Sequence, residues 1–172
     1  MLTSAIVILA AVAAPLQDST AVVRPDPAPP TLEQTRYLEG LRSVARGVAQ
    51  LRDGIDRVAR TQQGRDTLRQ RQAGRRLGGL CTTARSFMST GRPRMQSNAY
   101  ADSMRIVARQ LTARVDSVLK FLPTCETTAG KKPASVAADL LNRMKAYEVA
   151  LAAFRTALAP PKPDSTKTSN QR

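Results

Sequence analysis

Apolar residues recur at alternating steps of three and four along the first half of the chain. They follow the order Tyr37, Leu41, Val44, Val48, Leu51, Ile55 and Val58. Residues with this spacing lie along one side of an α-helix, so the segment predicts an amphipathic helix. Thr31 and Gln34 have the spacing of a capping box, which places the start of this helix directly after Pro30.

Two later segments repeat the pattern, over about residues 98–122 and 134–158. The first carries Tyr100, Met104, Val107, Leu111, Val115, Val118 and Leu122. The second carries Ala137, Leu140, Met144, Tyr147, Leu151, Phe154 and Leu158. Because proline lacks the amide hydrogen that a helix needs, we expect the first to end before Pro123 and the second before Pro160. Residues 123–133 are then a loop.

A further helical stretch, roughly residues 63–89, is less regular. Glycines interrupt it, and residues 65–76 contain one large apolar side chain, Leu68. We expect a break or turn within Thr61–Gly79 and a loop over residues 89–98. No alternating strand pattern occurs. The predicted fold is all-α: an antiparallel bundle of three long helices plus a shorter broken one, in a single domain over residues 31–158.

Three glycines stand seven residues apart in the first helix, at Gly40, Gly47 and Gly54, each directly before an apolar position. A glycine in a helix interior costs about 1 kcal/mol relative to alanine. The stripe therefore predicts close packing against another helix; a groove that exposes backbone to a ligand is the alternative. Two pairs of alanines would fit as partners: Ala101 with Ala108, and Ala146 with Ala153.

The ends of the chain differ in composition from the helical part. Residues 1–13 form an uncharged, mostly apolar run that ends in Ala11-Val12-Ala13, the small-x-small pattern of a signal peptide. Residues 14–30 are a proline-rich linker, and residues 159–172 have the composition of a disordered tail. We expect a periplasmic or secreted protein without a membrane span after cleavage. A buried N-terminal strand or helix is the alternative.

The two cysteines, Cys81 and Cys125, fit no metal motif, and in an oxidising compartment they would form a disulfide. The bond constrains the fold, because residues 82–97 would have to run the length of the next helix to bring the cysteines together. Either that helix begins later, near Asp102, or residues 82–97 are mostly extended. If neither holds, the cysteines are free.

The net charge is +14, and 21 of the 27 basic residues are arginine. From Arg60 to Arg94 there are nine arginines and a single acid, Asp66. Such a charge favours an anionic envelope surface or an acidic protein as partner, and a solvated face is the alternative. The candidate binding residues are Arg65, Arg69, Arg71, Arg75 and Arg76. Nucleic acid is not expected, because only six aromatic residues occur and four of them belong to the apolar seams.

The chain has no histidine and none of the glycine-rich phosphate-binding motifs. We therefore predict no catalytic residues, metal or cofactor, and favour non-enzymatic binding. The alternative function is a small-molecule site or a His-independent catalytic bundle of the secreted mutase type. The first helix lacks the lysine that secreted chorismate mutases use. Self-association through an apolar stripe that the core leaves exposed is a third possible function, and the sequence does not predict the oligomeric state.

Overall fold

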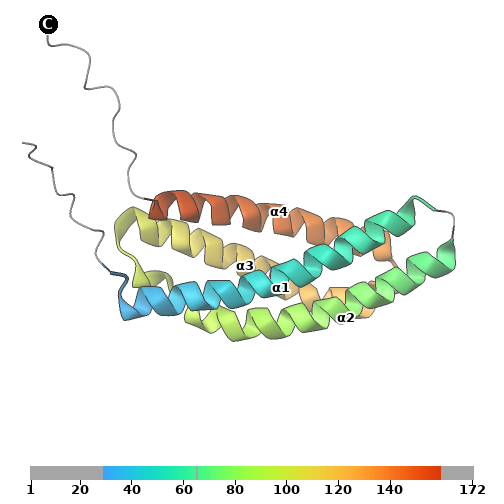
Figure 1. Ribbon diagram of the computed structural model, residues 1–172, viewed down its shortest axis with the longest axis horizontal. Helices are drawn as coiled ribbons and strands as arrows, with labels where there is room; N and C mark the ends of the chain where they lie inside the picture. The colour runs from blue at the N-terminus through green and yellow to red at the C-terminus, as the bar shows by residue number, and fades with distance from the viewer. Residues whose placement is uncertain (1–28, 65, 160–172) are drawn as a thin grey trace, which may run out of the picture.

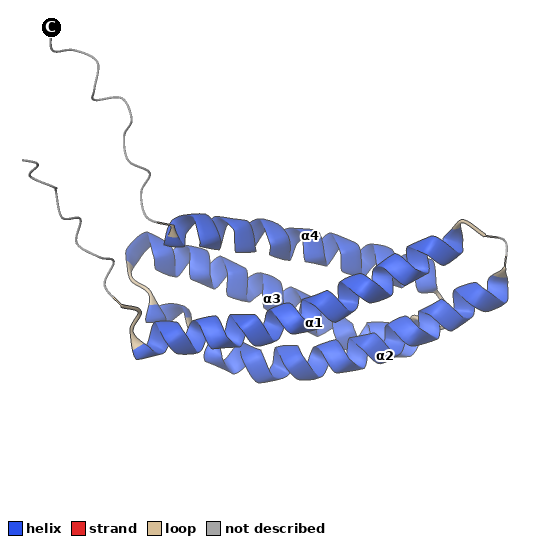
Figure 2. Ribbon diagram, viewed as in Figure 1, coloured by secondary structure: helices blue, strands red, loops and turns tan. Residues whose placement is uncertain are grey.

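The computed structural model describes residues 29–64 and 66–159, and these form an antiparallel bundle of four helices without strands (Figures 1 and 2). The helices are α1 (Leu32–Gln62), α2 (Thr67–Gly91), α3 (Asp102–Thr128) and α4 (Pro133–Leu158), with the short 3-10 helices η1 (Arg92–Arg94) and η2 (Ser97–Ala99) between α2 and α3. The all-α antiparallel bundle is confirmed, although α2 is an unbroken helix of 25 residues. The predicted signal peptide, most of the linker and the tail lie outside the described residues.

Local side-chain bonds set where α1 and α2 begin. Gln34 N donates to Thr31 Oγ1 at 3.2 Å, and Thr31 N donates to the Gln34 side chain at 3.0 Å, which completes the predicted capping box. Asp66 Oδ1 accepts the backbone N–H groups of Leu68 and Arg69 at 3.0 and 3.1 Å. Both caps satisfy amides that have no partner inside their helix. The break expected within Thr61–Gly79 is the short turn between these two helices.

One core runs between the four helices. Leu111 is fully buried, and the half-buried Leu41 and Leu151 pack against the same cluster. At one end, the rings of Tyr37, Tyr100 and Phe154 lie with centroids 5.2–5.6 Å apart. Tyr37 Oη donates to the carbonyl oxygen of Ala108 at 3.0 Å, which links α1 to α3. The core is thus filled by apolar and aromatic side chains.

Two other tyrosines carry buried hydroxyls that no group within the described residues accepts, Tyr100 and Tyr147. Burial raises the pKa of each from 10.0 to about 12. A hydroxyl whose folded pKa exceeds its unfolded value favours the folded state while it stays protonated. That contribution is complete below pH 10.0 and is lost as the pH rises toward about 12. We expect the thermal midpoint to fall over this alkaline range.

Thermal unfolding from pH 8 to pH 12, followed by circular dichroism, measures this effect. The variant Tyr147→Phe is the control, since it removes one buried hydroxyl and keeps the ring. We expect it to be at least as stable as the parent at neutral pH and to lose less stability in alkali. An equal alkaline loss in parent and variant would show that Tyr147 makes no contribution.

The glycine stripe of α1 packs closely, but its partner is α2. A Cβ built on Gly40 would lie 2.6 Å from the carbonyl oxygen of Gly91, and one on Gly47 would lie 2.9 Å from that of Ala84. One on Gly54 would lie 2.7 Å from Cδ1 of Leu77. The prediction of Ala101 with Ala108, and of Ala146 with Ala153, as partners was wrong, because none of them is among the nearest neighbours of an added Cβ. The short turn makes α1 and α2 antiparallel neighbours. Each successive contact therefore lies seven residues further along α1 and seven residues earlier along α2.

The third predicted helix was misplaced at both ends. It begins at Asp102 instead of Asn98, and it continues through Pro123 to Thr128. Pro123 is exposed, and Cys125 extends the buried seam that includes Leu122. Burial of this seam therefore outweighs the backbone hydrogen bond that proline removes.

Cys81 and Cys125 form a disulfide that joins α2 to α3. The sequence allowed two arrangements for this bond, and the structure has the first of them, in which α3 begins near Asp102. The segment between α2 and α3 crosses one end of the bundle (Figure 1) and is held by Arg92, whose Nε and Nη2 donate to the two carboxylate oxygens of Asp116 at 2.5 and 2.8 Å. This bond to Asp116 raises the pKa of Arg92.

Candidate anion-binding site

The hairpin formed by α1 and α2 projects past the turn that joins α3 to α4 (Figure 1). Between Val58 and Ala73, no residue that the structure describes is buried. We call residues 59–72 the hairpin tip. Helix ends that bury no side chains gain little from packing. Packing in the core therefore does not determine which residue types occur in the hairpin tip.

The structure divides four of the five arginines named from the sequence between two hollows. Arg69 and Arg76 line one hollow of α2, whereas Arg71 and Arg75 line another. Arg65 lies outside the described residues. The spacing explains the division, because residues seven apart, or four apart, share a helix side. The four described arginines therefore line two different hollows of α2.

The first hollow lies between α1 and α2 and has a volume of about 400 Å³. We call it the α1–α2 hollow; it is lined by Arg57, Arg60, Thr61, Arg69, Gln72, Ala73 and Arg76. Four arginines thus line this hollow, and no Asp or Glu is among its lining residues. The sequence analysis missed Arg57 and Arg60, because the contribution of α1 depends on which side of it α2 occupies.

Nearby acids neutralise part of this charge. Arg57 pairs with Asp53 at 2.8 Å and Arg69 pairs with Asp66 at 3.2 Å, both at the surface. Among the described residues, Arg60 and Arg76 form no ion pair. Exposed pairs contribute little energy and exchange partners readily. All four arginines can therefore turn toward an anion.

The second hollow lies between α2 and the end of α3 and has a volume of about 530 Å³. We call it the α2–α3 hollow; it is lined by Leu68, Arg71, Arg75, Gly78, Gly79, Thr82, Glu126, Thr127, Gly130 and Lys131. Its acid, Glu126, pairs through Oε2 with Arg85 at 3.2 Å, while its Oε1 is buried and has no hydrogen-bond partner in the part of the chain that the structure describes. Among the described residues, its three cations form no ion pair.

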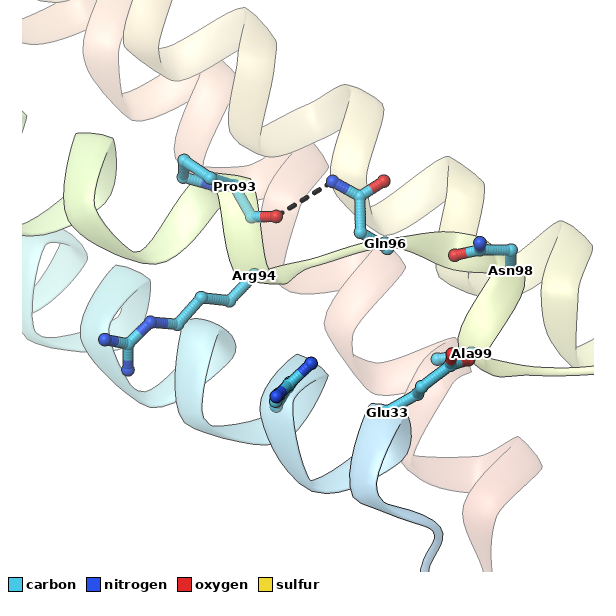
Figure 3. Close-up of a pocket in the computed structure, with 7 residues that line it drawn as sticks. Glu33, Pro93, Arg94, Gln96, Asn98 and Ala99 are labelled. Atoms are coloured by element: carbon cyan, nitrogen blue, oxygen red, sulfur yellow. Dashed lines mark hydrogen bonds between the residues drawn. The ribbon is translucent and has the colours of Figure 1, made fainter.

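A third hollow, of about 310 Å³, lies at the other end of the bundle between α1 and the η1–η2 segment (Figure 3). Its polar side chains do not converge. Arg94 extends away from Asn98, and the amide of Gln96 donates to the carbonyl oxygen of Pro93 at 2.8 Å. Glu33 and Ala99 also line this hollow. This hollow contains the residue types of a small-molecule site, but its polar side chains do not point toward one common space.

Across residues 29–64 and 66–159, no three His, Cys, Asp or Glu side chains are placed to hold a metal ion. None of the helices in this part of the chain has an apolar stretch long enough to span a membrane.

The arrangement at the hairpin tip thus offers guanidinium groups to anions on two sides of α2. Comparisons with protein-family models, with curated proteins and with solved structures find no match for this chain.

Proposed function

We propose that this protein is exported and binds an anionic surface of the cell envelope through the basic hairpin tip and the two hollows beside it. The observation that carries the proposal is the gathering of seven basic residues around one end of α2. They are Arg57, Arg60, Arg69 and Arg76 in one hollow, and Arg71, Arg75 and Lys131 in the other.

The two hollows can face the same surface. At 3.6 residues per turn, the direction of Arg69 and Arg76 differs from that of Arg71 and Arg75 by about 130°. The exposed residues Gln72 and Gly79 lie between the two directions. An extended anionic surface that approaches this ridge would therefore contact arginines on both flanks, whereas a single small anion would reach only one hollow.

Other features agree with a role outside the cytoplasm. The disulfide between Cys81 and Cys125 is compatible with an oxidising compartment. The small-x-small motif near residue 13 supports export. A flat polyanion suits arginines spread over a convex tip better than an acidic protein would, because protein partners require complementary shape over a defined area.

Co-sedimentation with vesicles tests this proposal. The vesicles contain 30 mol% phosphatidylglycerol in phosphatidylcholine, and binding is measured at low and high salt. We expect strong binding at low salt that weakens steeply with added salt, since screening shortens the reach of charges to about 10 Å at 0.1 M. The triple variant Arg69→Glu/Arg75→Glu/Arg76→Glu should bind at least tenfold more weakly.

The matched control reverses three exposed arginines elsewhere on the helices, Arg42, Arg46 and Arg109. The two triple variants have the same net charge, so only the position of the change differs. Equal losses in both would mean that total charge drives binding and would overturn the proposal. Tight binding to polyglutamate without binding to vesicles would instead identify an acidic polypeptide as the partner.

A further inference from the structure

Gly79 differs from the other glycines in the helices. At Gly40, Gly47, Gly54, Gly74, Gly78 and Gly91, an added Cβ would lie within 3.1 Å of a neighbouring atom. At Gly79, it would meet nothing within 4 Å. Packing therefore explains six glycines and leaves Gly79 unexplained, although it costs the helix about 1 kcal/mol relative to alanine.

Gly79 borders the α2–α3 hollow, where its missing side chain leaves space. Arg71 and Arg75 stand four residues apart along the same wall. The aliphatic part of the Arg75 side chain passes close to Gly130, where an added Cβ would lie 3.1 Å from its Cγ. Lys131 follows in the α3–α4 turn and lines the same hollow. Three cations from two different segments thus line one hollow.

We propose that the α2–α3 hollow binds a phosphate-class oxyanion through Arg71 and Arg75 of α2 and Lys131 of the α3–α4 turn, in the space over Gly79. A tetrahedral oxyanion presents oxygens in several directions and can bond to donors from both segments, whereas a carboxylate presents two oxygens in one plane. The inference rests on the proposed function and identifies the group that this part of the site recognises.

Neighbouring lysines provide the first test. Lys131 lines the hollow and Lys132 does not, although both are exposed. We expect Lys131→Gln to weaken binding of vesicles with 30 mol% phosphatidylglycerol at least fivefold and Lys132→Gln to leave it nearly unchanged. Equal effects of the two substitutions would overturn the inference.

Gly79→Gln provides the second test, because glutamine is neutral and favours helix. We expect the thermal midpoint to rise and affinity for the same vesicles to fall about tenfold. Thr90→Gln, on an exposed position of the same helix, should leave the affinity unchanged. Unchanged affinity in Gly79→Gln would overturn the inference. If the triple arginine reversal still abolished binding, the proposed function would stand.

Two further experiments distinguish a lipid head group from a free phosphate ion. One is titration with inorganic phosphate, and the other is the binding of both probes to the variant Leu68→Gln. Leu68 is 72% exposed and lines the same hollow, where it would contact the acyl region of a lipid but not a free ion. Vesicle binding that weakens in Leu68→Gln, with phosphate binding preserved, supports a lipid head group. If Leu68→Gln binds both the vesicles and inorganic phosphate as the parent protein does, the result supports a free phosphate. Neither probe binding to the parent protein would overturn the inference.

Discussion

Replacing Gly91 by alanine is expected to lower the free energy of unfolding by about 3 kcal/mol, the upper part of the range for overpacking. The new Cβ would lie 2.4 Å from the carbonyl oxygen of Gly40 and 2.9 Å from Cβ of Ser43. These atoms belong to the interior of α1, so the clash is relieved only by moving one helix away from the other. Thermal and urea unfolding measure the loss.

The control is the same substitution at Gly79, where the added methyl group meets no neighbour. Alanine favours the helix by up to about 1 kcal/mol there, so Gly79→Ala should be more stable than the parent. Because Gly91 has φ −78°, alanine can adopt its backbone conformation, and the difference between the variants isolates the close contact. A stabilising Gly91→Ala substitution would contradict the antiparallel contact between α1 and α2.

Removing the disulfide by the double substitution Cys81→Ala/Cys125→Ala is expected to have the largest effect on stability. The bond spans 44 residues of sequence and joins α2 to α3. On the chain-entropy model, a loop of that length contributes about 4 kcal/mol. Both cysteines are fully buried, so the lost sulfur atoms also remove packing from the core.

Denaturation of the parent protein with and without dithiothreitol gives an independent measurement of the same effect. We expect the reductant to lower the urea midpoint of the parent protein and to leave that of the double variant unchanged. A parent protein that unfolds at the same urea concentration in both conditions would show that the bond adds no stability.

The sequence by itself determined the features that depend on neighbouring residues. The seam from Tyr37 to Val58 defined α1, and the capping residue Thr31 located its start. Pro160 follows α4 closely, and that helix ends at Leu158 as expected. Periodicity also indicated which sides of α1, α3 and α4 are buried. These signals are local, because a cap or a helix side depends on residues within one or two turns.

Only the tertiary structure decided what depends on two segments meeting. It paired the glycine stripe with α2, continued α3 through Pro123 and divided the named arginines between two hollows. It also brought Arg60 and Lys131 to the candidate site. The physical reason is that an apolar seam specifies burial without specifying its partner. Which helices touch follows from the short α1–α2 turn and the disulfide, whose effects act across the whole bundle.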